Sequence, residues 1–249
     1  MTLFARTHYV QIELSNICQY AWLHKKCPVH LEMASPFRVK RPRHLPGDLV
    51  RHVLDTLGAY SYRGGITFQH YNEPLIDPRL FEFIRYAKKQ CLNAKITAVS
   101  NGGYLSRQLA EELKEAGLDR IHVTLYGSQK DRDVMQRRVR KEIMPLWPQE
   151  CNVLTWGMDD RLCIYDREYL DDRGNCYAPL SSIIITRDAE WALCCRDWKR
   201  TVTFGSLMEN TFEDLLRSEE PRRIYEALSH GDRTVLDVCR RCKSAITPR

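Results

Sequence analysis

The feature that most constrains the fold is an alternation of strand-like and helix-like segments between residues 8 and 155. Strand-like runs of apolar or alternating residues occupy positions 9–14, 66–70, 95–99 and 121–125, and helical spacing of apolar residues separates them. Repeated strand–helix units favour parallel strands joined by right-handed crossovers. The sequence therefore predicts an α/β fold, either an open doubly wound sheet or a full or partial β/α barrel.

Helical spacing of leucines and other apolar residues covers positions 49–57, 80–87 and 105–113. Asp77 followed by Pro78 predicts a capped start for the second of these helices, and Gly117 predicts the end of the third. In parallel α/β folds, the loops that follow strands carry the chemistry. Those loops are predicted at residues 18–27, 71–74, 100–103 and 126–128.

The strand–helix rhythm changes after about residue 172. Two apolar runs, 183–186 and 191–194, flank the polar stretch Arg187-Asp188-Ala189-Glu190, which predicts a β-hairpin. Helices are expected around 211–217 and 221–229. We therefore expect two parts, a barrel over residues 1–170 and a small hairpin-plus-helix module over residues 171–249.

Composition narrows the class of protein. The net charge of +6 is spread over the whole chain of 249 residues, which does not favour a nucleic-acid partner. No apolar run is long enough to span a membrane, and the first residues lack the order of a signal peptide, so we expect a cytoplasmic protein. Ten cysteines in a reducing compartment indicate a metal or redox role.

Four cysteines of the second part are expected to meet. Cys239 and Cys242 form a C-x2-C pair, a spacing that lets two thiolates bind one metal centre. Cys176 precedes the predicted hairpin and Cys194 ends it, so the hairpin can bring both to one end of the module. The four thiolates suit either zinc or an iron–sulfur cluster, and their spacing does not choose between these.

Several motifs follow one another in a familiar order. They are Gly64-Gly65-Ile66-Thr67-Phe68 leading to Asn72-Glu73-Pro74, then Val99-Ser100-Asn101-Gly102, the approach to the fourth strand over 116–127, and in the module Phe204-Gly205-Ser206-Leu207 with the helix over 212–216. Together they resemble the radical S-adenosylmethionine (SAM) superfamily, specifically members with a C-terminal SPASM/twitch module. The resemblance implies a partial (β/α)6 TIM-like barrel followed by a small β-hairpin-plus-helix auxiliary-cluster module.

The resemblance also implies cofactors and their ligands. We expect two 4Fe-4S clusters and SAM, with the auxiliary cluster bound by Cys176, Cys194, Cys239 and Cys242, and with Cys195 as a neighbour that is not a ligand. Asn72 stands where the family usually has glycine. The residues expected to contact SAM lie after strands two, three and four: Tyr71, Asn72, Glu73, Ser100, Asn101, Thr124 and Tyr126.

The first-cluster loop departs from the family pattern. That pattern is C-x3-C-x2-C, yet counting forward from Cys18 reaches Trp22 and Lys25 instead of cysteines. Counting back from Cys27 reaches His24, whose imidazole would replace a thiolate. We expect Cys18, His24 and Cys27 to bind this atypical cluster. The alternatives are a solvated histidine beside a cluster held by two thiolates, or no cluster at all.

The function that the resemblance implies is an oxidoreductase. It would abstract a hydrogen atom through a 5'-deoxyadenosyl radical and pass an electron to the auxiliary cluster, oxidising a secondary alcohol of a sugar or aminocyclitol. Arg167, Arg196 and Asp197 are candidates to bind or deprotonate that hydroxyl, with surface ion pairs as the alternative. An external one-electron donor such as flavodoxin or ferredoxin would be the partner.

Two other functions stay open at this point. The same scaffold can carry an epimerase or a peptide-modifying enzyme, since these also hold auxiliary clusters. The incomplete cysteine motif is also what a non-catalytic cluster-binding protein with a degenerate SAM site would show.

Overall fold

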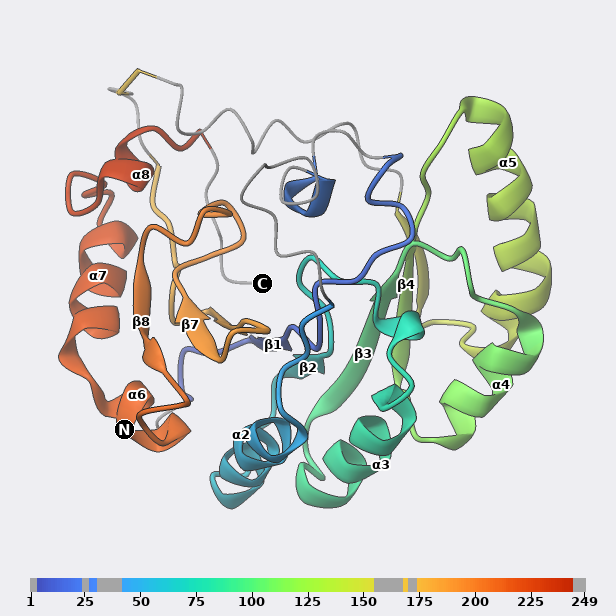
Figure 1. Ribbon diagram of the computed structural model, residues 1–249, viewed down its shortest axis with the longest axis horizontal. Helices are drawn as coiled ribbons and strands as arrows, with labels where there is room; N and C mark the ends of the chain where they lie inside the picture. The colour runs from blue at the N-terminus through green and yellow to red at the C-terminus, as the bar shows by residue number, and fades with distance from the viewer. Residues whose placement is uncertain (1–3, 24–26, 31–41, 155–167, 170–173, 244–249) are drawn as a thin grey trace.

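A computed structural model of the chain describes residues 4–23, 27–30, 42–154, 168–169 and 174–243. Eight strands form one sheet in the order β5-β4-β3-β2-β1-β6-β7-β8. Figure 1 shows this sheet curving, with the helices of the barrel on its outer side. The strands are β1 Tyr9–Ile12, β2 Gly65–Thr67, β3 Lys95–Ser100, β4 Arg120–Thr124, β5 Cys151–Leu154, β6 Ser182–Ile185, β7 Glu190–Ala192 and β8 Thr203–Ser206.

The six strands from β5 to β6 are parallel, with β1 between β2 and β6. In β1, Val10 and Ile12 are fully buried and belong to the hydrophobic core. Because side chains alternate along a strand, Gln11 and Glu13 point to the opposite, inner face of the curved sheet. The predicted partial (β/α)6 barrel is confirmed.

Four longer helices follow the strands of the barrel: α2 Gly47–Ala59, α3 Leu80–Gln90, α4 Arg107–Glu115 and α5 Gln129–Arg138. The first three bury apolar stripes against the sheet, such as Leu54 and Leu57 of α2 and Phe83 of α3. Helical spacing therefore predicted these faces well. The short helices η1 Pro74–Ile76, η2 Val139–Ile143 and η3 Met144–Leu146 complete the barrel part, and η2 is a π-helix.

The predicted start of α3 at Asp77 and Pro78 is wrong by two residues. The helix begins at Leu80, after Arg79, and no side chain caps it. The carboxylate of Asp77 instead accepts hydrogen bonds from the backbone and guanidinium of Arg79. That guanidinium also donates to the carbonyls of Leu14 and Leu45, so the Asp77–Arg79 pair holds loops together at the barrel rim.

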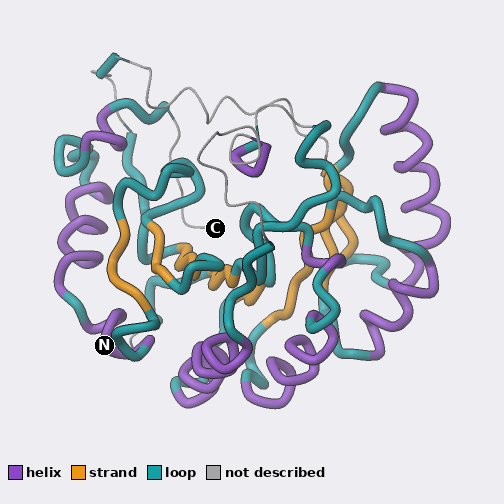
Figure 2. Tube along the Cα trace, in the orientation of Figure 1, coloured by secondary structure: helices purple, strands orange, loops and turns teal. Residues whose placement is uncertain are grey.

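The predicted hairpin is confirmed, since β6 and β7 pair antiparallel, and β8 adds a third strand that the sequence did not indicate. Helices α6 Phe212–Arg217, α7 Glu219–Ser229 and α8 Asp237–Arg240 follow it. Because β6 also pairs parallel with β1, the hairpin continues the barrel sheet without a break, as the orange strands of Figure 2 show. Among the described helices, none has the length and apolar character that crossing a bilayer requires.

Candidate iron–sulfur and SAM site

Hydrogen bonds of Glu73 join the loops that follow β1, β2 and β3. Its carboxylate accepts hydrogen bonds from the Ser100 hydroxyl at 2.8 Å and from the Asn101 backbone at 2.7 Å. Its own backbone N–H donates to the carbonyl of Ile17 at 2.8 Å. The expected SAM loops therefore form one hydrogen-bonded unit at the carboxyl edge of the sheet.

Burial controls the ionisation of this carboxyl group. Only 2% of Glu73 is exposed, and burial raises the pKa of its side chain above the ordinary value of 4.5. Hydrogen bonds from Asn101, Ser100 and the Leu75 backbone act in the opposite direction because they favour the carboxylate. Among the described residues, Glu73 is thus held in place by hydrogen-bond donors.

Asn72, which stands where the family usually has glycine, forms two hydrogen bonds to the backbone through its side chain. Its amide oxygen accepts from the His70 backbone at 3.0 Å, and its amide nitrogen donates to the Phe68 carbonyl at 3.2 Å. Asn72 is not among the described residues with positive φ. The loop is therefore closed by an asparagine side chain, which commonly mimics a backbone turn, without left-handed geometry.

Two of the three expected first-cluster ligands share this site. The amide nitrogen of Asn101 lies 3.6 Å from the sulfur of Cys18. The pKa of the Cys18 thiol is raised to about 11, mainly by burial and also by the nearby charges of Glu73 and Cys27. Bound iron would reverse this, since a cation stabilises thiolates. His24 lies outside the described residues, so the third ligand stays a prediction.

The remaining expected SAM contacts lie on the same edge of the sheet. Thr124 ends β4 and is 8% exposed. Tyr126 follows it, with its ring 6.1 Å from the ring of Tyr20 in the first-cluster loop. Tyr71 differs, because its hydroxyl donates to the backbone carbonyl of Cys195 at 2.7 Å and so reaches the hairpin part.

The four cysteines expected to bind the auxiliary cluster line one cavity. The cavity walls also include Arg196, Arg233 and the apolar residues Ala178, Leu193, Leu228 and Val238. Cys195 is not part of this lining, which agrees with its expected exclusion from the ligand set. The structure thus brings together the four expected ligands: Cys176, Cys194, Cys239 and Cys242.

The chemistry of these thiols fits a cationic cluster. The pKa of Cys239 is raised to about 12, mainly by burial and also by the neighbouring Cys176 and Cys242. The pKa of Cys194 is likewise raised well above its ordinary value, mainly by burial and also by the charges of Cys195 and Cys239. Several thiolates in one buried cavity repel one another unless bound iron compensates their charge. The residues present therefore fit the group.

The lining of the cavity is its best-defined feature. Among the described residues, no three His, Cys, Asp or Glu side chains converge on a single metal ion. The four thiols instead surround a cavity. Arg233 is 3% exposed and links both ends of the module, since its guanidinium donates to the carbonyls of Gly174 at 2.8 Å and Cys242 at 2.7 Å. The sequence did not single out Arg233.

The candidate catalytic residues fall in different places. Arg196 lines the auxiliary cavity, and its backbone N–H donates to the sulfur of Cys194 at 3.4 Å. The carboxylate of Asp197 accepts three hydrogen bonds of 2.9 Å each from Thr201 and Val202, which shape the turn after Cys194. Asp197 thus has a structural position in that turn. Arg167 lies outside the described residues.

Glu13 and Arg187 form a buried pair that sequence reasoning missed. Glu13 is 1% exposed and Arg187 is 3% exposed. The carboxylate accepts the Arg187 backbone N–H at 3.1 Å and lies 3.5 Å from its guanidinium. The signal was available, because the polar positions of a barrel strand face the inside. The alternating run 9–14 was treated only as evidence for a strand.

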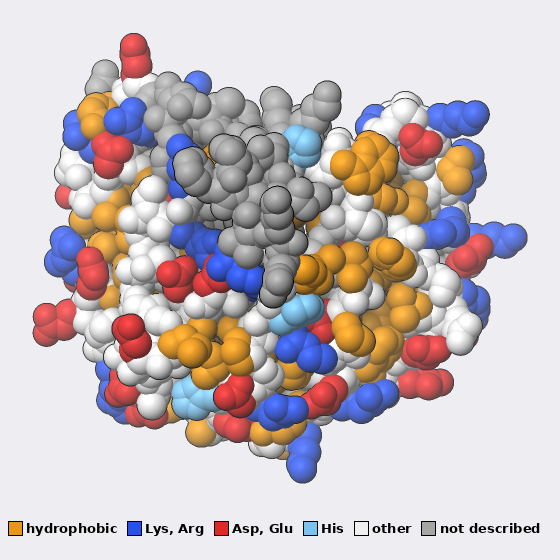
Figure 3. Space-filling view, in the orientation of Figure 1, with side chains coloured by type: hydrophobic (Ala, Val, Ile, Leu, Met, Phe, Trp, Pro, Cys, Tyr) orange, Lys and Arg blue, Asp and Glu red, His pale blue; other side chains and the backbone are white. Residues whose placement is uncertain are grey.

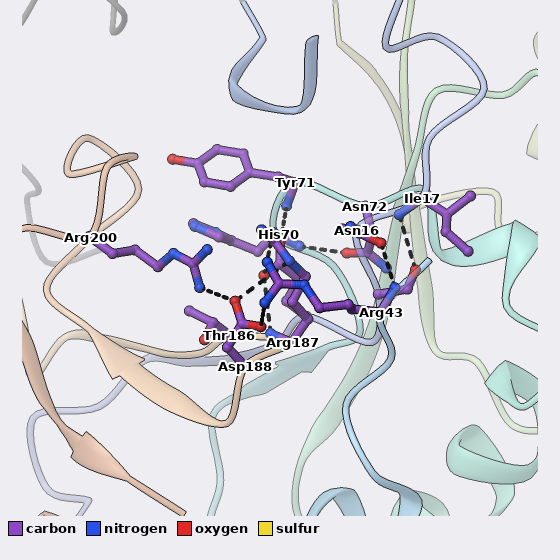
Figure 4. Close-up of polar contacts among 12 residues, drawn as sticks. Asn16, Ile17, Arg43, His70, Tyr71, Asn72, Thr186, Arg187, Asp188 and Arg200 are labelled. Atoms are coloured by element: carbon purple, nitrogen blue, oxygen red, sulfur yellow. Dashed lines mark hydrogen bonds and ion pairs between the residues drawn. The ribbon is translucent and has the colours of Figure 1, made fainter. Parts of the chain in front are cut away.

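Figure 4 shows further charged side chains beside Arg187, namely Arg43, Asp188 and Arg200. Arg43 and Arg200 both contact the carboxylate of Asp188, which follows Arg187 in the β6–β7 turn. Burial alone would raise the pKa of Asp188, but the neighbouring Arg200 and Arg187 outweigh it and lower the pKa. The turn of the hairpin is therefore fixed by ion pairs at the barrel rim.

A partial barrel with two thiols in its strand-end loops, and a cavity lined by four more, has the ligands of a thiolate-bound metal or iron–sulfur protein of the α/β class. Residues 15–147 match the radical SAM superfamily, and residues 176–243 match the iron-sulfur cluster-binding domain SPASM. The first match covers more than half of the chain, and the protein belongs to the radical SAM superfamily. Its cofactors are accordingly SAM and 4Fe-4S clusters.

Relatives of known structure or function support the same architecture. The S-adenosyl-L-methionine-dependent 2-deoxy-scyllo-inosamine dehydrogenase of Niallia circulans is 20% identical over 243 residues, covering 94% of this chain and 92% of its own. The crystal structure of BtrN with AdoMet and 2-DOIA has a TM-score of 0.80 at 19% identity, covering 98% of this chain and 96% of its own. Native anSMEcpe with AdoMet and the Cp18Cys peptide has a TM-score of 0.54 at 10% identity, covering 96% and 92%.

Proposed function

We propose that the protein is a radical SAM oxidoreductase that oxidises a secondary alcohol of a sugar or aminocyclitol to a ketone. The observation that carries the proposal is the four-thiol cavity on the same continuous sheet as the SAM loops. The name of the Niallia circulans relative describes a dehydrogenase of 2-deoxy-scyllo-inosamine, which supports this substrate class.

The reaction balances as a two-electron oxidation. When bound, SAM and the first cluster would supply a 5'-deoxyadenosyl radical, using one electron from the external donor and releasing methionine, and this radical would take one hydrogen atom from the carbinol carbon to give 5'-deoxyadenosine. The hydroxyl proton would go to a base, and the auxiliary site would accept the remaining electron. Four protein thiolates at that site leave no open iron for substrate, which suits electron uptake.

Residues of this chain supply orientation. Glu73 holds the SAM loops together, and Cys18 with Cys27 holds the first cluster. Arg196 is proposed to bind the substrate hydroxyl, because it lies at the wall of the auxiliary cavity. Arg167 and His24 keep the roles expected from the sequence, as substrate-binding residue and third cluster ligand.

The external electron donor is proposed to be a small acidic carrier protein such as flavodoxin or ferredoxin. Helix α5 contacts the SAM-site loop, since Arg138 donates to the carbonyls of Gly102 and Leu105 at 2.9 and 2.8 Å. Both α5 and η2 carry exposed cations, and Trp22 of the first-cluster loop is 67% exposed. Figure 3 shows Lys and Arg side chains along the edge of the molecule that α5 forms.

Anaerobic reconstitution followed by iron counting and SAM cleavage tests the proposal. We expect about eight irons per chain and 5'-deoxyadenosine formation with dithionite. Addition of 2-deoxy-scyllo-inosamine and related aminocyclitols should give a ketone product with one 5'-deoxyadenosine per turnover. About four irons without cleavage would identify a degenerate SAM site and contradict the proposal.

The anSMEcpe match favours one alternative, a peptide-modifying enzyme, because its structure holds a peptide with AdoMet. SAM cleavage stimulated by peptides and not by cyclitols would support that alternative. Substitution His24→Ala tests the atypical ligand, since loss of about four irons per chain is expected only if the imidazole binds the first cluster.

A further inference from the structure

Tyr71 connects the SAM loop to the hairpin part through two separate contacts. Its backbone N–H donates to the carboxylate of Glu13 at 3.2 Å, and its hydroxyl donates to the carbonyl of Cys195 at 2.7 Å. The residue directly precedes Asn72 and Glu73, which close the expected SAM loop. One residue therefore contacts both halves of the candidate site.

The first contact continues into the hairpin turn. Glu13 bridges the two parts, because one oxygen accepts from Tyr71 while the other accepts from the backbone of Arg187 at 3.1 Å. Both charged side chains are 1% exposed, so water does not compete with these bonds. Figure 4 shows Tyr71 and Arg187 close together between the loop after β2 and the turn after β6.

The second contact reaches the loop that carries an expected cluster ligand. Cys195 follows Cys194, whose thiol lines the auxiliary cavity and accepts a hydrogen bond from the Arg196 backbone. Asp197 fixes the next turn of the same loop through its bonds to Thr201 and Val202. The Tyr71 hydroxyl therefore joins the SAM loop to a cluster-ligand loop whose next turn is held by the hydrogen bonds of Asp197.

We propose that Tyr71 and Glu13 are positioning residues that fix the SAM loop against the auxiliary-cluster loop, so that SAM binding changes the environment of the auxiliary cluster. The inference rests on the proposed function, because it requires both cofactors. It assigns neither residue a chemical step.

Substitution Tyr71→Phe in the reconstituted holoenzyme tests this, because it removes only the hydroxyl. In the wild type, adding SAM should shift the midpoint potential or the electron paramagnetic resonance signal of the auxiliary cluster. In Y71F this response should be lost, and the dissociation constant for SAM should rise about threefold to tenfold, as expected for one lost hydrogen bond. Iron content should stay at the wild-type value.

Tyr86→Phe is the matched control. Tyr86 donates to Asp55 on the surface, between helices α3 and α2, so its loss should change none of these readouts. A second variant, Glu13→Gln, removes the charge and gives Tyr71 and Arg187 a single acceptor oxygen. E13Q should weaken the same response even if its iron content is unchanged.

The results separate the two proposals. The positioning role alone is overturned by either of two results. In the first, the wild type cleaves SAM but SAM changes neither the potential nor the spectrum of its auxiliary cluster. In the second, Y71F keeps the full wild-type response. A reconstituted wild type that does not cleave SAM with dithionite overturns the proposed function instead.

Discussion

Asp77 has a fully buried side chain that binds Arg79 through both oxygens. Burial alone would raise the pKa of Asp77, but the hydrogen bonds and charge of Arg79 outweigh it and hold the pKa below the ordinary 3.8. Arg79 extends the same link to the carbonyls of Leu14 and Leu45. One carboxylate thus stabilises the rim beside the SAM loop.

Substitution Asp77→Asn should lower the free energy of unfolding by about 2 kcal/mol at pH 7, since it weakens hydrogen bonds to a charged group. The folded pKa lies below the unfolded pKa, so the stabilisation is present above pH 3.8 and is lost as pH falls through the folded pKa. Denaturant titrations of D77N and wild type at several pH values should therefore converge in acid.

The exposed pair Arg107–Glu111 on α4 offers a control for that measurement. Glu111→Gln should change the free energy of unfolding by less than about 0.5 kcal/mol. A D77N variant as stable as E111Q at pH 7 would show that the buried contact contributes nothing.

Residues of the site differed in how well the sequence predicted them. The cysteine spacing placed Cys176, Cys194, Cys239 and Cys242 together, because a hairpin and a C-x2-C turn each fix two thiols locally. Glu13 pairs with Arg187, which lies 174 positions away. The alternation of the first strand could have placed Glu13 inside the barrel, but it does not identify the partner. Such contacts depend on the strand order, which the sequence pattern did not specify.

Helix α5 differs from the other barrel helices. None of its ten residues, all of them described, is buried, and Val134 is 52% exposed. Ser128 and Asp131 form a capping box at its start, so local hydrogen bonds stabilise a helix with little packing. Its exposed cations suit binding of an acidic protein more than core formation.

Charge reversal on this helix and the following η2, Arg137→Glu with Lys141→Glu, should raise the KM for reduced flavodoxin on the order of tenfold at low salt. SAM cleavage driven by dithionite should not change, because the small reductant needs no docking surface. Arg223→Glu on α7 makes the same kind of charge change on the hairpin part and should have little effect. Equal effects of both variants would argue against a docking role for α5.

Element prediction succeeded where periodicity was strong and failed where a local signal had another use. Apolar spacing located α2, α3 and α4 with their buried faces. The Asp77-Pro78 pair predicted a helix start, but the carboxylate of Asp77 binds the guanidinium of Arg79 and the helix begins at Leu80. Strand β8 was missed because Phe204-Gly205-Ser206-Leu207 served only as a motif, and its Gly205 at φ 109° interrupts the strand pattern.

At the scale of the whole molecule, the cysteine cavity joins segments that lie far apart in the chain. Cys176 and Cys194 flank the hairpin, while Cys239 and Cys242 lie in and after α8 near the end of the described chain. A bound cluster would cross-link these segments, because it would bind cysteines from both. It would therefore contribute directly to the free energy of folding.

Cys239→Ser should therefore reduce iron from about eight to about four per chain and lower the melting temperature of the reconstituted protein. Iron analysis and thermal unfolding measured anaerobically provide the readouts. Cys195→Ser is the control within the adjacent pair, and it should keep all of its iron. Loss of about four irons in C195S would make Cys195 a ligand, and full iron retention in C239S would remove Cys239 from the ligand set.

The pairing of β1 with both β2 and β6 has a consequence for protein engineering. A chain cut between the barrel and the hairpin would leave one edge of β1 without its partner strand β6, and unpaired strand edges promote aggregation. Transplanting the cysteine module onto a foreign barrel would therefore require β6 to travel with it, together with a recipient strand of matching register.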